Sequence, residues 1–75
     1  MIENEIVVLA IDLPESGLRI GDIGTIVMCH NNSLGYEVEF VKFNGETISV
    51  ETLNGSQIRP VANDEIPHVR LVQVA

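Results

Sequence analysis

The sequence predicts an all-β fold in one domain that spans residues 1–75, and three observations support this. Hydrophobic residues make up 45% of the chain and aromatic residues only 4%, so valine, isoleucine and leucine, which favour a pleated and half-buried surface, dominate. The apolar residues occur in short runs separated by glycine, proline, asparagine and aspartate, as is typical of strands joined by turns. No segment has the apolar spacing of an amphipathic helix of adequate length. A chain of 75 residues suits one thin core.

Two strands are expected in the first half of the chain. The continuous apolar run EIVVLAI, residues 5–11, indicates a strand that is covered on both faces. Residues 12–19 collect Asp, Pro, Glu, Ser and Gly, so we expect a loop there. The run IGTIVMCH, residues 23–30, predicts a second strand, and the polar residues 31–35 predict a turn.

A hairpin is predicted around Asn44 and Gly45, which separate two strands over residues 36–43 and 46–53. A three-residue loop over 43–45 places Gly45 where left-handed backbone is needed and sets Lys42 opposite Glu46. A two-residue loop would instead place the apolar side of the first strand opposite the polar side of the second strand, which would leave the apolar side chains without apolar neighbours. We therefore expect Phe40, Val38 and Tyr36 to face Ile48, Val50 and Thr52. This register leaves four polar side chains exposed to solvent: Glu37, Glu39, Ser49 and Glu51. In it, Glu37 lies opposite Glu51.

The last third of the chain predicts one edge strand and one segment with two possible uses. Residues 54–57 indicate a turn, and the short run 58–61 is interrupted by Pro60, which suits the edge of a sheet. Residues 66–75 return to alternation and supply a possible sixth strand. If they pair with their own sheet, they cap its edge. If they reach a neighbour, the protein is an exchanged dimer, and we favour this homodimer.

The stretch LRIGDIGTIV raises the question of a phosphate-binding loop, because Gly21 and Gly24 stand three residues apart with Asp22 between them. Such a loop needs a following helix, whose backbone amides bind the phosphate. The β-branched run 25–27 disfavours a helix. We therefore expect Gly21 and Asp22 to form a turn and Gly24 to let the strand bulge or twist sharply.

Composition excludes several classes of function. The formal net charge of −7 repels the phosphate backbone, so nucleic acid is not an expected partner. The acidic start of the chain does not resemble a signal peptide, and no apolar run is long enough for a membrane span. Cys29 is the only cysteine, which rules out an intrachain disulfide and favours a cytoplasmic setting. The only soft metal ligands are Cys29, His30 and His68, and they do not have the CxxC or HxxxH spacing of a metal site. We also expect no cofactor.

Two groups of side chains are candidates for function. The acids Glu37, Glu39 and Glu51 form either an ordinary solvated face or a surface for a basic protein. Arg59, His68 and Arg70 lie in a stretch that also holds Asp64 and Glu65, and His68 invites comparison with a catalytic base. Pro67 and the lack of a helix argue against that use, so partner-binding or surface ion pairs are expected instead. Cys29 and the adjacent His30 point to opposite faces of a strand, which excludes a Cys–His nucleophile built from this pair.

The motif GxxGTIV after a loop resembles the start of small SH3-like barrels, which include ribosomal and transcription-factor modules that contact RNA. Those relatives are typically basic around the motif, whereas this chain has only Arg19 nearby. The resemblance implies an SH3-like β-barrel of five or six short antiparallel strands. It also keeps an RNA- or ribosome-associated module as an alternative.

Almost the whole chain is similar to a widespread family of small bacterial proteins catalogued as a domain of unknown function. The segments that carry the resemblance are DLPESGLRIGDIGTIV, YEVEF, TL, IRPV and HVR. Such proteins are often encoded beside toxin-like proteins, so the resemblance implies an antitoxin or immunity role. The sequence hypothesis is a non-enzymatic module that binds a basic, toxin-like protein. An accessory subunit of an enzyme, using His68 and its neighbours, is the other alternative.

Overall fold

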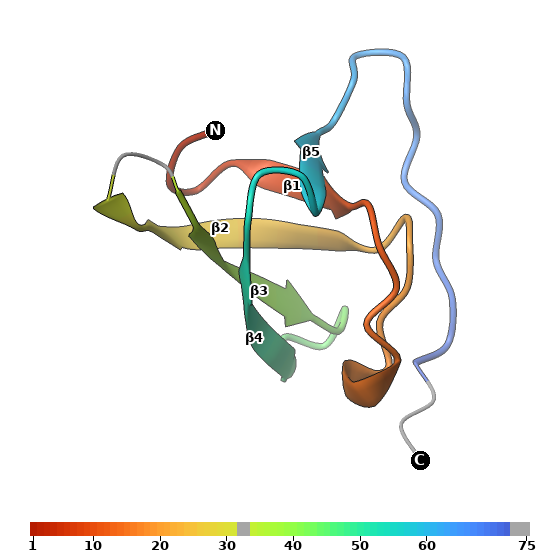
Figure 1. Ribbon diagram of the computed structural model, residues 1–75. Helices are drawn as coiled ribbons and strands as arrows, with labels where there is room; N and C mark the ends of the chain where they lie inside the picture. The colour runs from red at the N-terminus through yellow and green to blue at the C-terminus, as the bar shows by residue number, and fades with distance from the viewer. Residues whose placement is uncertain (32–33, 73–75) are drawn as a thin grey trace.

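The structure, a computed structural model, describes residues 1–31 and 34–72 and forms one antiparallel sheet (Figure 1). Its five strands within these residues are β1 (Ile6–Leu9), β2 (Ile23–Cys29), β3 (Tyr36–Val41), β4 (Thr47–Leu53) and β5 (Ile58–Pro60). A short 3-10 turn, η1 (Pro14–Ser16), lies in the first loop. The strands lie side by side in the order β4-β3-β2-β1-β5. The predicted all-β class with short antiparallel strands is confirmed, and β5 lies at the edge of the sheet as expected.

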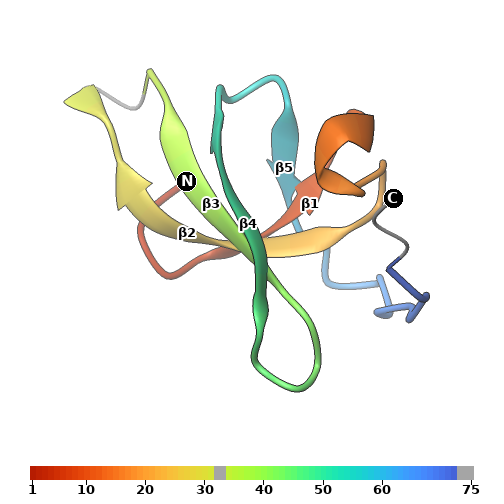
Figure 2. The ribbon, with the colours of Figure 1, turned by 90° about the horizontal axis from the view of Figure 1, so that it is seen from below.

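The core lies on the concave side of the strongly curved sheet (Figure 2). Alternate residues of β3 supply Tyr36, Val38 and Phe40, each at most 4% exposed, because side chains of a strand alternate between faces. Leu18 reaches the core from the first loop, which a bridge to Leu13 closes. The remaining buried members of this cluster are Val7, Leu9, Ile26, Leu53 and Ile58. Strands β1 to β5 thus surround one small apolar core.

Gly24 lies in a regular part of β2, where the core approaches the backbone. A Cβ atom on Gly24 would come within 2.6 Å of Cγ1 of Val38 and 2.9 Å of Cε1 of Phe40. Glycine is needed here for the close approach of Val38 and Phe40. Of the two expected uses of Gly24, the bulge is wrong, because the register of Gly24 with β1 is regular. The bulge of β2 lies instead between Ile26 and Met28, where the register with β3 shifts. The strand run that follows Gly24 confirms that no helix begins there.

Gly21 and Asp22 form the predicted turn before β2. Gly21 has a φ of +95°, a left-handed conformation that favours glycine. The Asp22 carboxylate accepts a hydrogen bond from the backbone N–H of Arg19 at 2.8 Å. The loop therefore bends the chain into β2, as the sequence indicates.

The hairpin between β3 and β4 has the predicted three-residue loop. The N–H of Lys42 donates to the carbonyl of Glu46 at 2.8 Å, and Gly45 has a φ of +93°. The Asn44 side chain accepts the N–H of Glu46 at 3.0 Å. The expected pairing of Lys42 with Glu46 and the roles of Asn44 and Gly45 are confirmed.

Beyond the loop, the predicted register is wrong by one residue. Val41 faces Thr47 but Phe40 faces Ser49, so Ile48 is an extra residue that forms a bulge. The remaining pairs are Glu39 with Val50, Val38 with Glu51, Glu37 with Thr52 and Tyr36 with Leu53. Ile48 and Leu53 are an odd number of residues apart, so plain alternation cannot turn both toward the core. The bulge lets Ile48 pack against the core while Leu53 is buried within it.

The C-terminal segment, residues 61–72, runs from β5 past the first loop without forming a strand (Figure 1). The sixth strand expected from residue 66 is therefore absent as far as Val72, because the segment is held by side chains rather than by a ladder. The rest of that predicted run, residues 73–75, lies outside the described residues. So do residues 32 and 33 of the predicted turn between β2 and β3.

Candidate protein-binding surface

The convex side of the sheet carries apolar side chains that the core does not use. The register places Ile6, Thr25, Glu39 and Val50 in one row across β1, β2, β3 and β4. Continuing that register, Ile23 of β2 and Val41 of β3 belong to the next row. Ile6, Ile23, Val41 and Val50 are 41–54% exposed. These four residues, together with Glu37 and Glu39, are called the outer patch below.

Two of the predicted site acids lie on this convex side and are oriented by neighbouring side chains. The hydroxyl of Thr52 donates to both carboxylate oxygens of Glu37, at 3.0 and 2.8 Å. Nε2 of His30 lies 2.6 Å from Oε2 of Glu37. The hydroxyl of Thr47 donates to Oε2 of Glu39 at 2.7 Å. Glu37 is thus largely satisfied within the chain, whereas Glu39 keeps one carboxylate oxygen without a bond to any described residue.

The bonds to Glu37 also set its protonation. The hydrogen bond with His30, followed by those from Thr52, holds the pKa of the Glu37 carboxyl below its usual range. The outer patch is therefore negatively charged at neutral pH.

Glu51, the third predicted site acid, lies on the opposite face of the sheet. It is opposite Val38, and its carboxylate accepts a hydrogen bond from the hydroxyl of Ser16 at 2.8 Å. The bulge at Ile48 causes this change, because a shift of one residue moves a side chain to the other face. The expected surface of three acids is therefore corrected to a pair, with Glu51 joining β4 to η1.

Arg70 fastens the C-terminal segment to the first loop. Its Nε donates to Oδ1 of Asp22 at 2.8 Å, and its Nη2 donates to Oδ2 of Asp22 and to the carbonyl of Gly17. Burial alone raises the pKa of Asp22, but the bonds from Arg70 and from the backbone of Arg19, with the charges of both arginines, outweigh it and lower the pKa. The Asp22–Arg70 ion pair is called the clasp below.

Arg59 and His68 do not join Arg70 in one site. Both Nη atoms of Arg59 donate to Glu65, at 2.8 and 2.7 Å. These bonds, helped by the N–H of Ala62, lower the pKa of Glu65 to about 2. The side chain of His68 is exposed. The three predicted residues are therefore separated, with the two arginines neutralised by different carboxylates.

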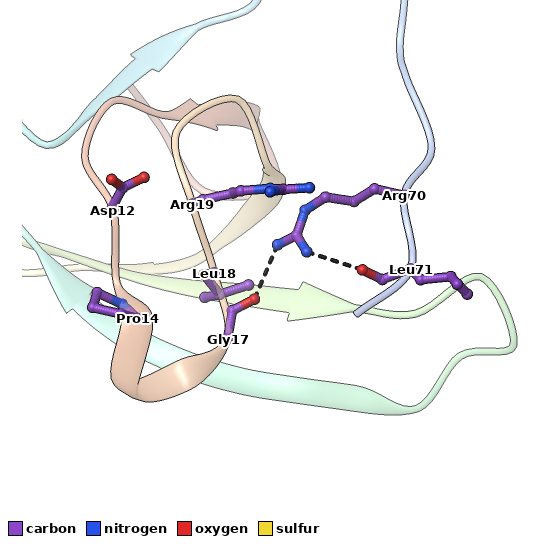
Figure 3. Close-up of a pocket in the computed structure, with 7 residues that line it drawn as sticks. All are labelled: Asp12, Pro14, Gly17, Leu18, Arg19, Arg70 and Leu71. Carbon is purple, nitrogen blue, oxygen red and sulfur yellow. Dashed lines mark hydrogen bonds between the residues drawn. The ribbon is translucent and has the colours of Figure 1, made fainter. Parts of the chain in front are cut away.

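An open pocket of about 400 Å³ lies between the first loop and the C-terminal segment (Figure 3). Arg19 and Arg70 extend toward one another across it, and Asp12 lies on the neighbouring limb of the first loop, beyond Arg19. Asp12 accepts the N–H of Ile20, and Asp22 binds Arg70. Acids and bases of this region are therefore interleaved, and Arg70 is already held by the chain itself.

Two arrangements that the sequence brought into question, a Cys–His pair and a metal site, are not formed by the described residues. Cys29 is partly buried against the core, while the neighbouring His30 is exposed and bound to Glu37. These two side chains point to opposite faces, as predicted. Within residues 1–31 and 34–72, no three His, Cys, Asp or Glu side chains are grouped so as to hold a metal ion.

Sequence reasoning missed the apolar part of the outer patch, because it assigned Val50 to the core and expected the strand that contains Ile6 to be covered on both faces. Ile6 is 54% exposed, so that expectation is wrong at this residue. The signal was present in β4, where Ile48 and Val50 share one phase of alternation and Leu53 has the other. It also missed the two bonds that join distant parts of the chain, Ser16 with Glu51 and Asp22 with Arg70. Neither pair has a local spacing that could reveal it.

Comparison with known proteins identifies a family without an assigned activity. Residues 3–60 match the family described as a domain of unknown function, DUF4926. No curated protein and no solved structure matches the chain. No described residue belongs to a helix with the length and apolar character that crossing a membrane requires. Since the match covers most of the sequence and all five strands, the chain belongs to the DUF4926 family.

Proposed function

We propose that this protein is a non-enzymatic binding module whose outer patch docks onto a basic protein. The observation that carries this proposal is the group of four exposed apolar side chains on the convex side of the sheet, with two carboxylates among them. Specific interfaces combine an apolar centre with polar groups that fix the register. The outer patch has both features on one rigid surface.

The charge of the partner follows from the chemistry of the patch. Glu39 keeps one carboxylate oxygen that can accept from an arginine or lysine of the partner, and such charge-assisted bonds are the strong ones. The net charge of −7 attracts a basic surface at long range and speeds the encounter. An anionic partner such as RNA would be repelled.

The resemblance to small bacterial proteins adds a biological role to this proposal. It implies an SH3-like barrel and an antitoxin or immunity protein that neutralises a toxin-like protein encoded beside it. We place that neutralisation in the cytoplasm and assign the basic toxin-like protein to the outer patch. Association with RNA and service as an accessory subunit of an enzyme are the competing roles that the experiment separates.

The experiment starts with a photo-crosslinking residue in place of Val41, in cells of the source organism. The crosslinked protein is identified, purified and titrated against the full chain by calorimetry at several salt concentrations. We expect a basic protein whose affinity falls as salt rises, because screening weakens attraction between exposed charges. Val41→Lys should weaken binding by about tenfold or more, as for a central interface residue.

Two carboxylates on opposite faces provide a matched control. Glu39→Gln should weaken binding, and Glu51→Gln should leave it within about twofold, because Glu51 lies on the concave side. Crosslinking to RNA, or to an acidic protein, would overturn the proposal. So would equal losses from the two substitutions. If the crosslinked protein is an enzyme whose activity requires His68, the accessory-subunit role is correct instead.

A further inference from the structure

The C-terminal segment exposes more apolar surface than its length explains. Ile66, Val69 and Leu71 are 76–89% exposed. Along the extended chain, Val69 and Leu71 lie on one side, while Arg70 and Val72 are turned toward the body of the protein. This alternation is that of a strand with one covered face and one uncovered apolar face.

The backbone of the same stretch is also unpaired. Among the described residues, no backbone–backbone hydrogen bond involves residues 66–72. The clasp nevertheless fixes the stretch, because Arg70 is bound to Asp22 and to the carbonyl of Gly17. An extended, fixed and unpaired chain is suited to adding itself to the edge of a sheet.

The two edges of the sheet differ in how well they are protected. Strand β5 has three residues and ends in Pro60, which cannot donate a ladder hydrogen bond. Strand β4 has seven residues without proline, and among the described residues it pairs with β3 alone. Its single charged side chain, Glu51, is turned to the concave side and bound to Ser16. Strand β4 therefore lacks the devices that normally block edge pairing.

The distribution of charge allows the segment of a second copy of this chain to approach that edge. All eleven acidic residues lie in residues 1–65, while residues 66–75 contain none and carry His68 and Arg70. Arg70 is already paired with Asp22 in the clasp. The segment therefore brings no acidic side chain, and so no short-range repulsion between carboxylates, to the edge of β4 in a second copy.

The position of the segment also suits a closed pair. Val72 lines a small cavity together with Lys42, Thr47 and Ile48, at the start of β4. The end of the donor segment therefore lies next to the start of the acceptor strand. With a twofold axis beside this patch, each copy can donate its segment and accept the segment of the other copy at its β4 edge. Such an arrangement forms a dimer and cannot grow further.

We propose that two copies of this chain associate by pairing residues 68–72 of each, which follow Pro67, with the exposed edge of β4 of the other, while the clasp stays formed. Val69 and Leu71 then lie beside Val50 on the extended outer face. This inference is independent of the partner proposed for the outer patch.

Sedimentation of the full chain over a concentration series up to about 1 mM tests the pairing. We expect a reversible dimer of the 8.2 kDa chain. Val69→Lys in the donor and Val50→Lys in the acceptor should each raise the dimer dissociation constant about tenfold or more. Backbone amides of β4 and of residues 68–72 should exchange more slowly as protein concentration rises.

Two further lysine variants control for the added charge. Leu34→Lys matches Val69→Lys in exposure, 77% against 76%, and Val27→Lys lies on the interior strand β2 at 44% exposure. Both controls should leave the dissociation constant within about twofold. A monomer throughout the series would overturn the proposal, as would a dimer that all four variants weaken alike or that none weakens.

Salt separates this proposal from the one for the outer patch. Two copies that each carry a charge of −7 repel one another at long range, so the dimer should strengthen as salt rises. Binding of a basic protein should weaken under the same change. Each proposal can therefore fail while the other stands.

Discussion

The sheet and the C-terminal segment are held in place by different kinds of interaction. Residues 6–60 form a hydrogen-bonded sheet over a core in which Val7, Ile26 and Val38 are fully buried. Residues 61–72 have the clasp and the Arg59–Glu65 ion pair, and their largest apolar side chains are exposed. Apolar burial contributes most to stability, whereas exposed ion pairs contribute little. The sheet is therefore stabilised by its own buried core, whereas residues 61–72 are held against the sheet mainly by ion pairs.

The largest expected effect comes from emptying the core of the sheet. Phe40→Ala should lower the free energy of unfolding by about 3–5 kcal/mol, since it removes a large buried side chain and leaves a cavity. Phe43→Ala is the matched control, because Phe43 is fully exposed at the hairpin tip. It should change stability by less than about 0.5 kcal/mol. Urea denaturation measures both, and similar losses would contradict the assigned core.

A smaller loss is expected from overfilling the same core. Gly24→Ala places a Cβ atom 2.6 Å from Val38 and 2.9 Å from Phe40, which should cost about 1–3 kcal/mol. Gly35→Ala meets its nearest neighbour at 3.5 Å, with no positive φ, and should cost less than about 1 kcal/mol. Thermal unfolding of the two variants compares them. Equal stability would mean that β2 does not approach β3 as closely as described.

The clasp should affect the segment more than the sheet. Asp22→Asn should lower stability by only about 1 kcal/mol, because the pair is partly exposed. The pKa of Asp22 is lowered from 3.8, so its contribution is present above that pH and is lost as pH falls through the folded value. Proteolysis within residues 61–72 should increase in this variant and at acid pH. The exposed Asp64 supplies the control, and an Asp64→Asn chain with the same sensitivity would argue against the clasp.

The smallest effect is a local change in titration within the segment. The carboxyl of Glu65 should titrate at about 2, well below its usual 4.5, when followed by nuclear magnetic resonance. Arg59→Ala should move that midpoint upward toward 4.5, because the two bonds from Arg59 are its main cause. A midpoint that stays near 2 in the variant would assign the shift to another group.

Local chemistry was sufficient to predict the fold class and the turns. The apolar runs predicted all five strands, and Pro60 predicted the edge position of β5. Asn44 and Gly45 predicted the hairpin loop and its left-handed glycine. These features depend on residues close in sequence, for which propensity and turn geometry decide.

Features that depend on packing between distant residues could not be predicted in the same way. The bulge at Ile48 reconciles the burial of Ile48 with that of Leu53, and it moves Glu51 away from Glu37 and Glu39. The alternation after residue 66 suggested another strand. The segment is instead held by the bond between Arg70 and Asp22, which is far away in the sequence. The clasp therefore could not be predicted from the sequence, and the outer patch could be recognised only once the bulge at Ile48 placed Val50 on the outer face.

Native-state hydrogen exchange on dilute full-length protein tests the contrast between the sheet and the segment most directly. Amides of β1, β2 and β3 should exchange only through global unfolding, while those of residues 66–72 should exchange far faster. Asp22→Asn should speed exchange in the segment and leave the slowest amides of the sheet nearly unchanged. Segment amides that exchange as slowly as those of the core would contradict the account, because they would show that the segment folds as part of the sheet.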